Sequence, residues 1–420
     1  MALLTRNQTN TMNRRQFLKT VPVPPLVALL AANGLLAISL RAADNASTRF
    51  IDTPSGQDWL VPWQKKIIAE ASNERFCDHE MGEELGWLVS PFLNGFYYGL
   101  LATGDPQWIA RLVDWAGACI QRAVLEPDGF SGWPKLGTGG LSEETFYTDS
   151  LLGEAMLLRP VVLLAGHILK TPALTAQWGA QAREYLKLGE RTFEKWDTRG
   201  CWRTVKNGGV WVVPDFGVDR HTGQWSAGYA KRHTTGFSHP ANKQNAIARW
   251  LLALHDTTGK VIYRERAEAW FRLMKSRLRP AGDGKYYVWN YWDPAGPWDY
   301  LPDGKTRHWV GVHPNGGYYA IDVEGITAAS EHGLVFTSED INRLIATNRD
   351  YMWNQQLNNA QFQRIDGGRP DPRWANTPGV LWTSLVPYDN TLRTIFLANH
   401  IPTSWGGLVI TPWFLSLPHG

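Results

Sequence analysis

The chain of 420 residues contains 42 lysines and arginines against 39 aspartates and glutamates, with 22 tryptophans and three cysteines. Five of the cations and none of the acids fall in residues 1–42, so 37 cations against 39 acids remain beyond that segment. The basic charge of the whole chain therefore does not indicate a nucleic-acid partner. Cys77, Cys119 and Cys201 are too few and too scattered for a disulfide framework or a zinc site. No metal and no cofactor is expected.

The N-terminal segment has the pattern of an export signal. A twin-arginine pattern at residues 13–19 (NRRQFLK) precedes an apolar run, Leu26–Leu40, and the small residues Ala42 and Ala43. The alternative, a membrane anchor, would need roughly 20 apolar residues in a row. We expect residues 1–42 to be a cleaved twin-arginine signal and residues 43–420 to be one domain. The mature protein would be a periplasmic or secreted monomer that does not bind a membrane.

Apolar residues recur at helical spacing along the rest of the chain, in paired segments. A first helix is expected over Trp59–Ala71. In the first pair, Gly104-Asp105-Pro106 ends one helix and starts the next, because Asp is a favoured N-cap and Pro a favoured first residue. The pairs are Leu85–Thr103 with Pro106–Val124, Phe146–Leu169 with a helix ending near Trp196, Asn245–Leu254 with Val261–Leu278, Tyr319–His332 with Ser338–Trp353, and Val380–Asn399 with a weakly marked last element.

The connections between the pairs are much longer than the turns inside them. They cover about 125–145, 197–241, 279–318 and 357–379, and they are rich in Trp, Tyr, Gly and Pro. Loops longer than about 12–15 residues are usually functional or disordered, and this composition is not that of a disordered segment. The pattern predicts an all-α fold, an (α/α) toroid or barrel of six or seven helical hairpins with long aromatic-rich loops on one rim. The alternative is an open solenoid or an irregular bundle.

One long connection is basic. The stretch from Arg220 to His255 contains no Asp or Glu, and it leads into an apolar helix at Ala246–Leu254. The first N–H groups and the dipole of a helix favour a negative charge at its N-terminus. This stretch indicates binding of an acidic polysaccharide, and the alternative is a solvated basic loop.

The residue types in these loops fit cleavage of a uronic-acid polymer by β-elimination. That reaction needs donors that neutralise the sugar carboxylate, a base and an acid. His239 is expected as base and Asn242 as the neutralising amide, while His233 and His313 are competing bases. Tyr291 is expected as a base once nearby cations lower its pKa, or as an acid in its phenol form. The alternatives are a backbone-bound His239, a core or stacking Tyr291 and a helix-capping Asn242. Substrate binding is expected from Arg232, His233, Lys243, Asn245, Trp289, Trp292, Arg307 and His313.

Two segments carry a resemblance to a known family. They are GFSHPANKQNAIARWLLAL (residues 236–254) and KYYVWNYWDPAGPWDY (residues 285–300). With the export signal and the paired helices, they resemble the (α/α)-toroid polysaccharide lyases, most closely polysaccharide lyase family 38, whose members act on alginate or glucuronan. The resemblance implies a mid-chain His and a Tyr some fifty residues later as the base and acid pair, here His239 and Tyr291. Related toroid lyases have Asn directly before the His, where this chain has Ser238.

Two other functions remain open. A glycoside hydrolase would need two carboxylates roughly 5–9 Å apart across the bond. Glu324 is the foremost candidate, although it could instead be a buried partner of Arg307 or Lys243. A periplasmic glycan-binding protein without catalysis would use the same aromatic loops. The acids that could serve a hydrolase are Glu143, Glu144, Asp149, Asp215, Glu324 and Asp389.

Overall fold

The computed structural model describes residues 49–79, 82–136, 146–214, 216–219, 221–227, 236–368 and 379–417. Ala46–Gly420 forms one compact unit. The predicted export signal lies outside the described residues, and so do the candidate site residues Arg232, His233, Glu143, Glu144 and Asp215.

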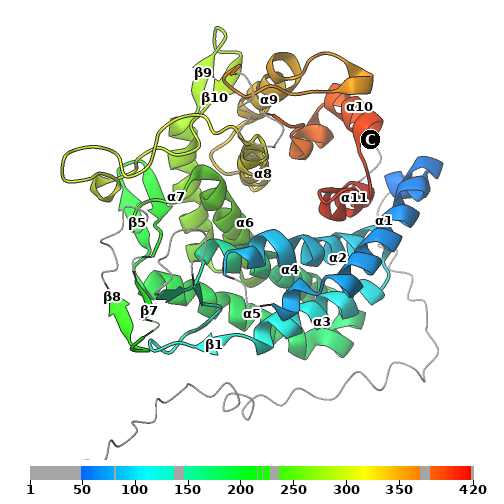
Figure 1. Cartoon of the computed structure of the whole chain (residues 1–420). Helices are drawn as coiled ribbons and strands as arrows, with labels where there is room; N and C mark the ends of the chain where they lie inside the picture. Colours follow the sequence, from blue (N-terminus) through cyan, green and yellow to red (C-terminus); the bar gives the residue numbers. More distant parts are fainter. Residues whose placement is uncertain are drawn as a thin grey trace, which may run out of the picture. The chain divides into compact units, whose positions relative to one another are not determined.

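Helices arranged in a ring make up most of this unit (Figure 1). Four inner helices pack side by side in succession: α2 (Ser90–Thr103), α4 (Leu151–Lys170), α6 (Ala241–Thr258) and α8 (Gly317–Glu331). Each is followed by an outer helix that returns the chain: α3 (Gln107–Gln121), α5 (Pro172–Thr198), α7 (Val261–Arg277) and α9 (Ser338–Ala346). The predicted all-α toroid is confirmed.

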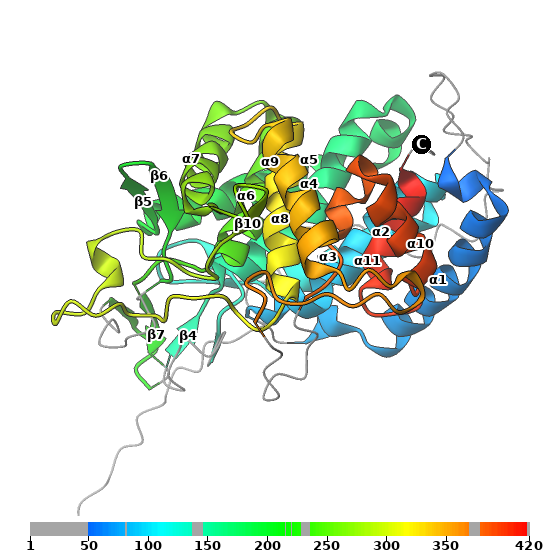
Figure 2. The same cartoon turned by 90° about the horizontal axis from the view of Figure 1, so that it is seen from above.

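The first and last helices close the ring. The short helix η10 (Thr383–Tyr388) packs on α8 and leads into α10 (Asn390–Asn399). Helix α11 (Gly407–Ser416) packs against both α2 and α1 (Pro54–Asn73), as Figure 2 shows at the blue and red ends of the chain. The Trp63 indole N–H donates to the Leu408 carbonyl oxygen at 3.1 Å, and the Phe396 and Phe414 rings lie 4.7 Å apart. Six helical pairs thus complete the circle within the described residues.

Local signals explain where several helices begin and end. The Ser150 hydroxyl accepts from the Gly153 N–H at 3.1 Å and caps α4, whereas α2 ends at Gly104, whose φ of 69° suits glycine. Helix α6 begins at Ala241, directly after Pro240, and thus several residues before the predicted start. Among the described residues, α4 is long and apolar enough to cross a membrane, but 78% of its apolar window is buried inside the ring.

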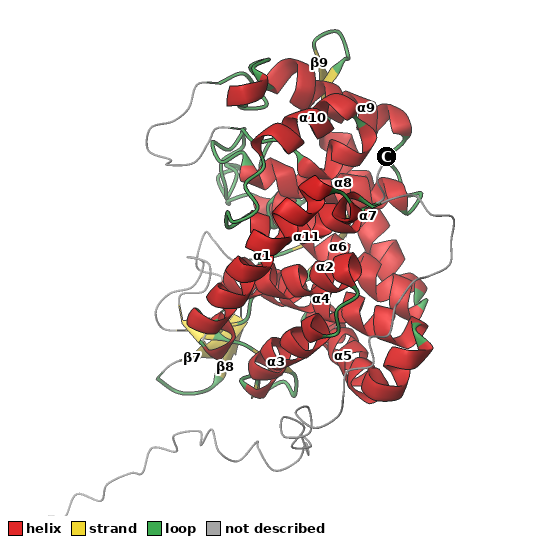
Figure 3. Cartoon of the chain, turned by 90° about the vertical axis from the view of Figure 1, so that its right-hand side faces the viewer, coloured by secondary structure: helices red, strands yellow, loops and turns green. Residues whose placement is uncertain are grey.

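The long connections carry short antiparallel strands, which Figure 3 shows at the edge of the helical body. A four-stranded sheet has the order β3-β4-β7-β8. Because each outer helix returns the chain, the inner helices run in one direction, and the long connections precede them at one rim. The strands are β1 (Val124–Leu125), β2 (Ser131–Gly132), β3 (Lys135–Leu136), β4 (Phe146–Thr148), β5 (Trp202–Val205), β6 (Gly208–Trp211), β7 (Phe216–Asp219), β8 (Trp225–Ala227), β9 (Arg279–Ala281) and β10 (Tyr286–Val288).

Candidate functional site

The three residues predicted to be catalytic lie together at the N-terminal end of α6. The backbone N–H of Ala241, between His239 and Asn242, donates to the Tyr291 carbonyl oxygen at 3.0 Å. The indole N–H of Trp292 donates to the Ser238 carbonyl oxygen at 2.8 Å. Two long connections, separated by about fifty residues in the sequence, therefore meet where α6 begins.

His239 and Asn242 are buried with unsatisfied polar atoms. His239 is 4% exposed, and neither of its ring nitrogens has a hydrogen-bond partner among the described residues; the same holds for Asn242 Oδ1. Burial, with a smaller contribution from the Lys243 charge, lowers the pKa of His239 to about 3, so the ring is neutral near pH 7. An unpaired buried polar group costs about 1–3 kcal/mol. Two of them at one helix start indicate a functional requirement more than a stabilising one.

Aromatic rings form a row beside this helix start. The Tyr291 ring stacks on Trp309, with centroids 5.8 Å apart and planes at 15°, and on Tyr318, at 5.3 Å and 27°. The His313 ring lies 4.7 Å from Tyr291. Trp309 is 45% exposed, so the row extends to the surface of the rim. Flat apolar faces with a few polar groups are typical of small-molecule sites.

Burial and nearby acidic and phenolic groups, rather than cations, act on the Tyr291 phenol and raise its pKa. Burial raises the pKa of its phenol, and the nearby Tyr318, Glu83 and Asp322 raise it further. A tyrosine base would need neighbouring cations that lower its pKa. Because carboxylates lie there instead, the surroundings favour the protonated phenol over the tyrosinate base.

Three residues predicted to bind substrate belong to the core instead. Trp289 and Trp292 are at most 1% exposed, so neither offers a ring face to a sugar. Asn245 is fully buried: its amide donates to Asp322 Oδ1 at 2.7 Å and its oxygen accepts from the Trp270 indole at 2.9 Å. These predictions are corrected, since the hydrogen bonds of Asn245 hold α6 against α8 and α7.

The other predicted binding residues line the same rim with defined partners. His313 Nδ1 accepts from the Asn315 N–H at 2.9 Å, and Arg307 donates to the Trp298 carbonyl oxygen at 3.2 Å. Lys243 Nζ donates to both carboxylate oxygens of Glu83 at 2.8 Å. Glu83 was missed in the sequence because nothing in the residues around it shows that its side chain turns toward α6.

Two partly exposed carboxylates pair with cations of α6. Glu83 binds Lys243, and Glu324 binds Arg249, not Arg307 or Lys243 as the sequence suggested. The Glu83 side chain is 12% exposed and the Glu324 side chain 34%. Only Oε2 of Glu324 contacts Arg249, so its Oε1 has no partner among the described residues.

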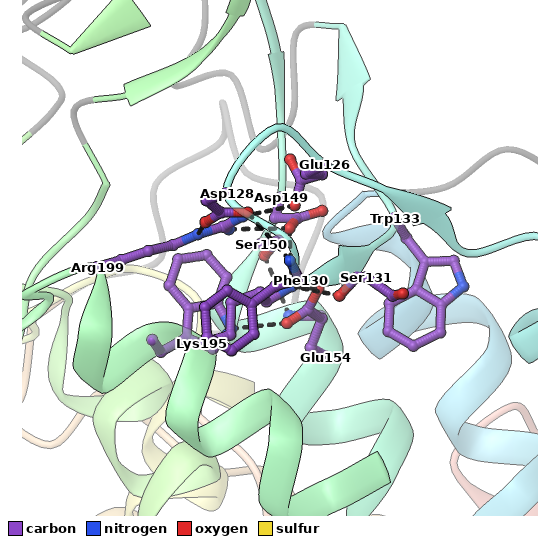
Figure 4. Close-up of polar contacts among 12 residues, drawn as sticks. Glu126, Asp128, Phe130, Ser131, Trp133, Asp149, Ser150, Glu154, Lys195 and Arg199 are labelled. Carbon is purple, nitrogen blue, oxygen red and sulfur yellow. Dashed lines mark hydrogen bonds and ion pairs between the residues drawn. The ribbon is translucent and has the colours of Figure 1, made fainter. Parts of the chain in front are cut away.

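The remaining candidate acids that the structure describes are structural. Asp389 caps α10 by accepting from the Leu392 N–H at 2.8 Å, and it also binds Arg349. Asp149 lies in the buried cluster of Figure 4, where Lys195 Nζ contacts Asp149 Oδ2 at 2.8 Å and Glu154 Oε1 at 2.5 Å. Both carboxylates are inaccessible to a polymer, because their side chains are 1% exposed.

Arg199 extends this cluster to the connection before α4. It donates to Glu126 at 2.6 Å, Asp128 at 2.7 Å and Asp149 at 3.1 Å (Figure 4). Burial and the Asp149 carboxylate raise the pKa of Glu126 to about 9. Within the part of the chain that the structure describes, no group of three or more His, Cys, Asp and Glu side chains is placed to hold a metal ion.

Comparison with known proteins gives a likeness of fold only. No protein-family model matches the chain, and no curated protein matches it. Two similar solved structures are inactive variants of an alpha-1,6-mannanase, GH76A of Salegentibacter sp. HEL1_6, in complex with alpha-1,6-mannotetrose and alpha-1,6-mannotriose. They are 12% and 11% identical to this chain, with TM-scores of 0.48 and 0.45, and each alignment covers 85% of this chain and 99% of the mannanase.

The resemblance to polysaccharide lyase family 38 is therefore corrected. Both similar structures are of a mannanase and neither is a lyase. The prediction of an alginate or glucuronan lyase is withdrawn.

Proposed function

We propose that the protein hydrolyses glycosidic bonds of a polysaccharide, with Glu83 and Glu324 as the reacting carboxylates. The proposal depends on one observation: two partly exposed carboxylates from different elements are each held by a cation of α6. Lys243 and Arg249 are six residues apart, which is about 9 Å along a helix axis. Inverting hydrolases hold their two carboxyl groups about 6.5–9.5 Å apart, with room for a water molecule.

The surroundings of the two carboxylates support a different role for each. Glu324 Oε1 has no partner among the described residues, so it is open to a water molecule, which suits the general base. Glu83 lies near the aromatic row of Tyr291 and Tyr318. A sugar stacked on that row would lie beside Glu83, which suits the residue that donates a proton to the leaving oxygen. Lys243 would then stabilise the carboxylate that forms when the proton leaves.

The experiment incubates the purified protein with a panel of neutral and acidic glycans and follows reducing ends, ultraviolet absorbance and the anomer released. Hydrolysis with inversion gives new reducing ends of inverted configuration and no ultraviolet absorbance. Glu83→Gln and Glu324→Gln should each lower kcat by about 10²–10⁴ with an unchanged Tm. The exposed Glu184→Gln should leave both kcat and Tm unchanged. An absorbing unsaturated product, or full activity in both site variants, would refute the proposal. Binding without turnover would favour a glycan-binding protein.

A further inference from the structure

A cluster of polar side chains lies inside the ring, deeper than the aromatic row. Arg159 on α4 donates to Asn94 Oδ1 at 3.0 Å and to the Tyr98 hydroxyl at 3.4 Å, both on α2. On the next two inner helices, Arg249 of α6 binds Glu324 of α8. Four successive inner helices thus contribute a side chain to what we call the lumen group.

These side chains lie at one depth. Arg159 and Arg249 each stand eight residues beyond the first residue of their helices, Leu151 and Ala241, and Glu324 stands seven beyond Gly317. Eight residues correspond to about 12 Å of helix. Since all these helices start at the same rim, the lumen group forms a layer about two turns below the helix starts at that rim.

The charges of the lumen group do not balance. It contains two guanidinium groups and one carboxylate, and Glu324 is already paired with Arg249. The partners that Arg159 binds are both neutral, and among the described residues no carboxylate lies within ion-pair distance of it. The Nε of Arg249 also has no partner among those residues. Burying a charge without a counter-charge is strongly unfavourable.

We propose that the lumen group is an anion-binding subsite, and that the glycan acted on here carries an anionic substituent, a carboxylate or a sulfate ester. This inference rests on the proposed function, because Glu324 belongs to both. Arg159 uses two of its five N–H groups on Asn94 and Tyr98, so three remain for a ligand. The planar guanidinium fork matches the two oxygens of such an anion.

The test measures binding directly. Glucose, glucuronate and glucose 6-sulfate are titrated into the full protein by calorimetry or ligand-observed NMR. We expect glucuronate or glucose 6-sulfate to bind at least ten times more tightly than glucose. Whichever of the two binds more tightly identifies the substituent. Arg159→Gln should abolish this preference, Arg159→Lys should keep part of it, and the exposed Arg183→Gln should keep all of it. Equal binding of the three sugars by the unmodified protein would overturn the inference, and so would a preference that survives in Arg159→Gln.

Turnover separates this inference from the proposed function. Acid binding without new reducing ends would refute hydrolysis and leave the subsite standing. Hydrolysis of neutral and acidic glycans at equal rates, unchanged in Arg159→Gln, would refute the subsite and leave hydrolysis standing. The binding titration needs no variant, so the inference remains testable even if Arg159→Gln does not fold.

Discussion

At the scale of single residues, Lys195 holds together the buried cluster below the connection before α4. Replacing it in Lys195→Met leaves Asp149 and Glu154 without their shared cation in a site that excludes water. Removing one partner of a buried ion pair costs about 3–5 kcal/mol. We expect a loss of that size in urea unfolding, and less than 1 kcal/mol for the exposed Lys187→Met on the same helix. Equal losses in the two variants would contradict this role.

Glu126 should make the stability of the protein depend on pH. Its pKa is raised to about 9 in the folded chain by burial and by Asp149, against about 4.3 when unfolded. The folded state therefore binds the extra proton between these values, so this group lowers stability as pH rises through that window. Glu126→Gln should flatten the fall in the free energy of unfolding between about pH 5 and 9, measured by urea titrations. The same slope in the variant and the unmodified protein would count against a protonated Glu126 in the folded state.

The residue scale is also where sequence reasoning was weakest. Lys195 occupies a position typical of the charged face of an amphipathic helix, and its partners Asp149 and Glu154 come more than forty residues earlier. No local pattern marks such a contact. His239, Asn242 and Tyr291 could be placed together because their loops both follow outer helices. The neighbouring Glu83 could not be placed with them, since the direction of its side chain depends on how α2 meets α6.

At the scale of elements, α6 and α8 cross so closely that no side chain fits at Gly325. A methyl group there would come within 2.6 Å of the Asn245 side chain, which is itself held by Asp322 and Trp270. Gly325→Ala should therefore cost about 1–3 kcal/mol through overpacking. Gly117→Ala on α3, where nothing lies within 4 Å, should instead stabilise the protein by about 1 kcal/mol. Thermal unfolding of both variants checks the two predictions. Stabilisation by Gly325→Ala would refute the close crossing of α6 and α8.

The paired helices of the ring were predictable because their apolar positions follow the helical period. The start of α6 was misplaced because Asn242, Lys243 and Gln244 looked like loop residues, whereas they form its first turn. Polar residues in a first turn are buried here because the neighbouring connections cover the rim. Covering of that kind is a tertiary effect, which the local sequence does not show.

At the scale of the whole molecule, the ring closes where α1 and α11 pack together. The Phe50 and Phe414 rings lie 5.0 Å apart, so residues 417 and 49 can be joined by a flexible linker. A permutant opened at the exposed turn after Gly259 should melt cooperatively and keep its activity. A permutant opened between the buried Ala246 and Ile247 should not fold. Circular dichroism melts compare the two, and failure of the first would contradict closure through α1 and α11.

The repeated pairs made the toroid predictable from the sequence, whereas its closure was not. Helix α11 was only a weakly marked last element, and its partner α1 lies about 350 residues earlier, so no spacing rule connects them. The Trp63 bond to the Leu408 carbonyl oxygen is visible only in the folded chain.

The short turns all lie at the end of the ring opposite the long connections, and this arrangement has a practical use. A cysteine or biotin tag placed at the turn after Gly259 or at the turn before Pro172 would tether the protein to a bead. The rim that carries the long connections would then face the solution. Oriented coupling of this kind would leave bulky polymers free access to the surface, whereas random coupling through lysines would also engage Lys243.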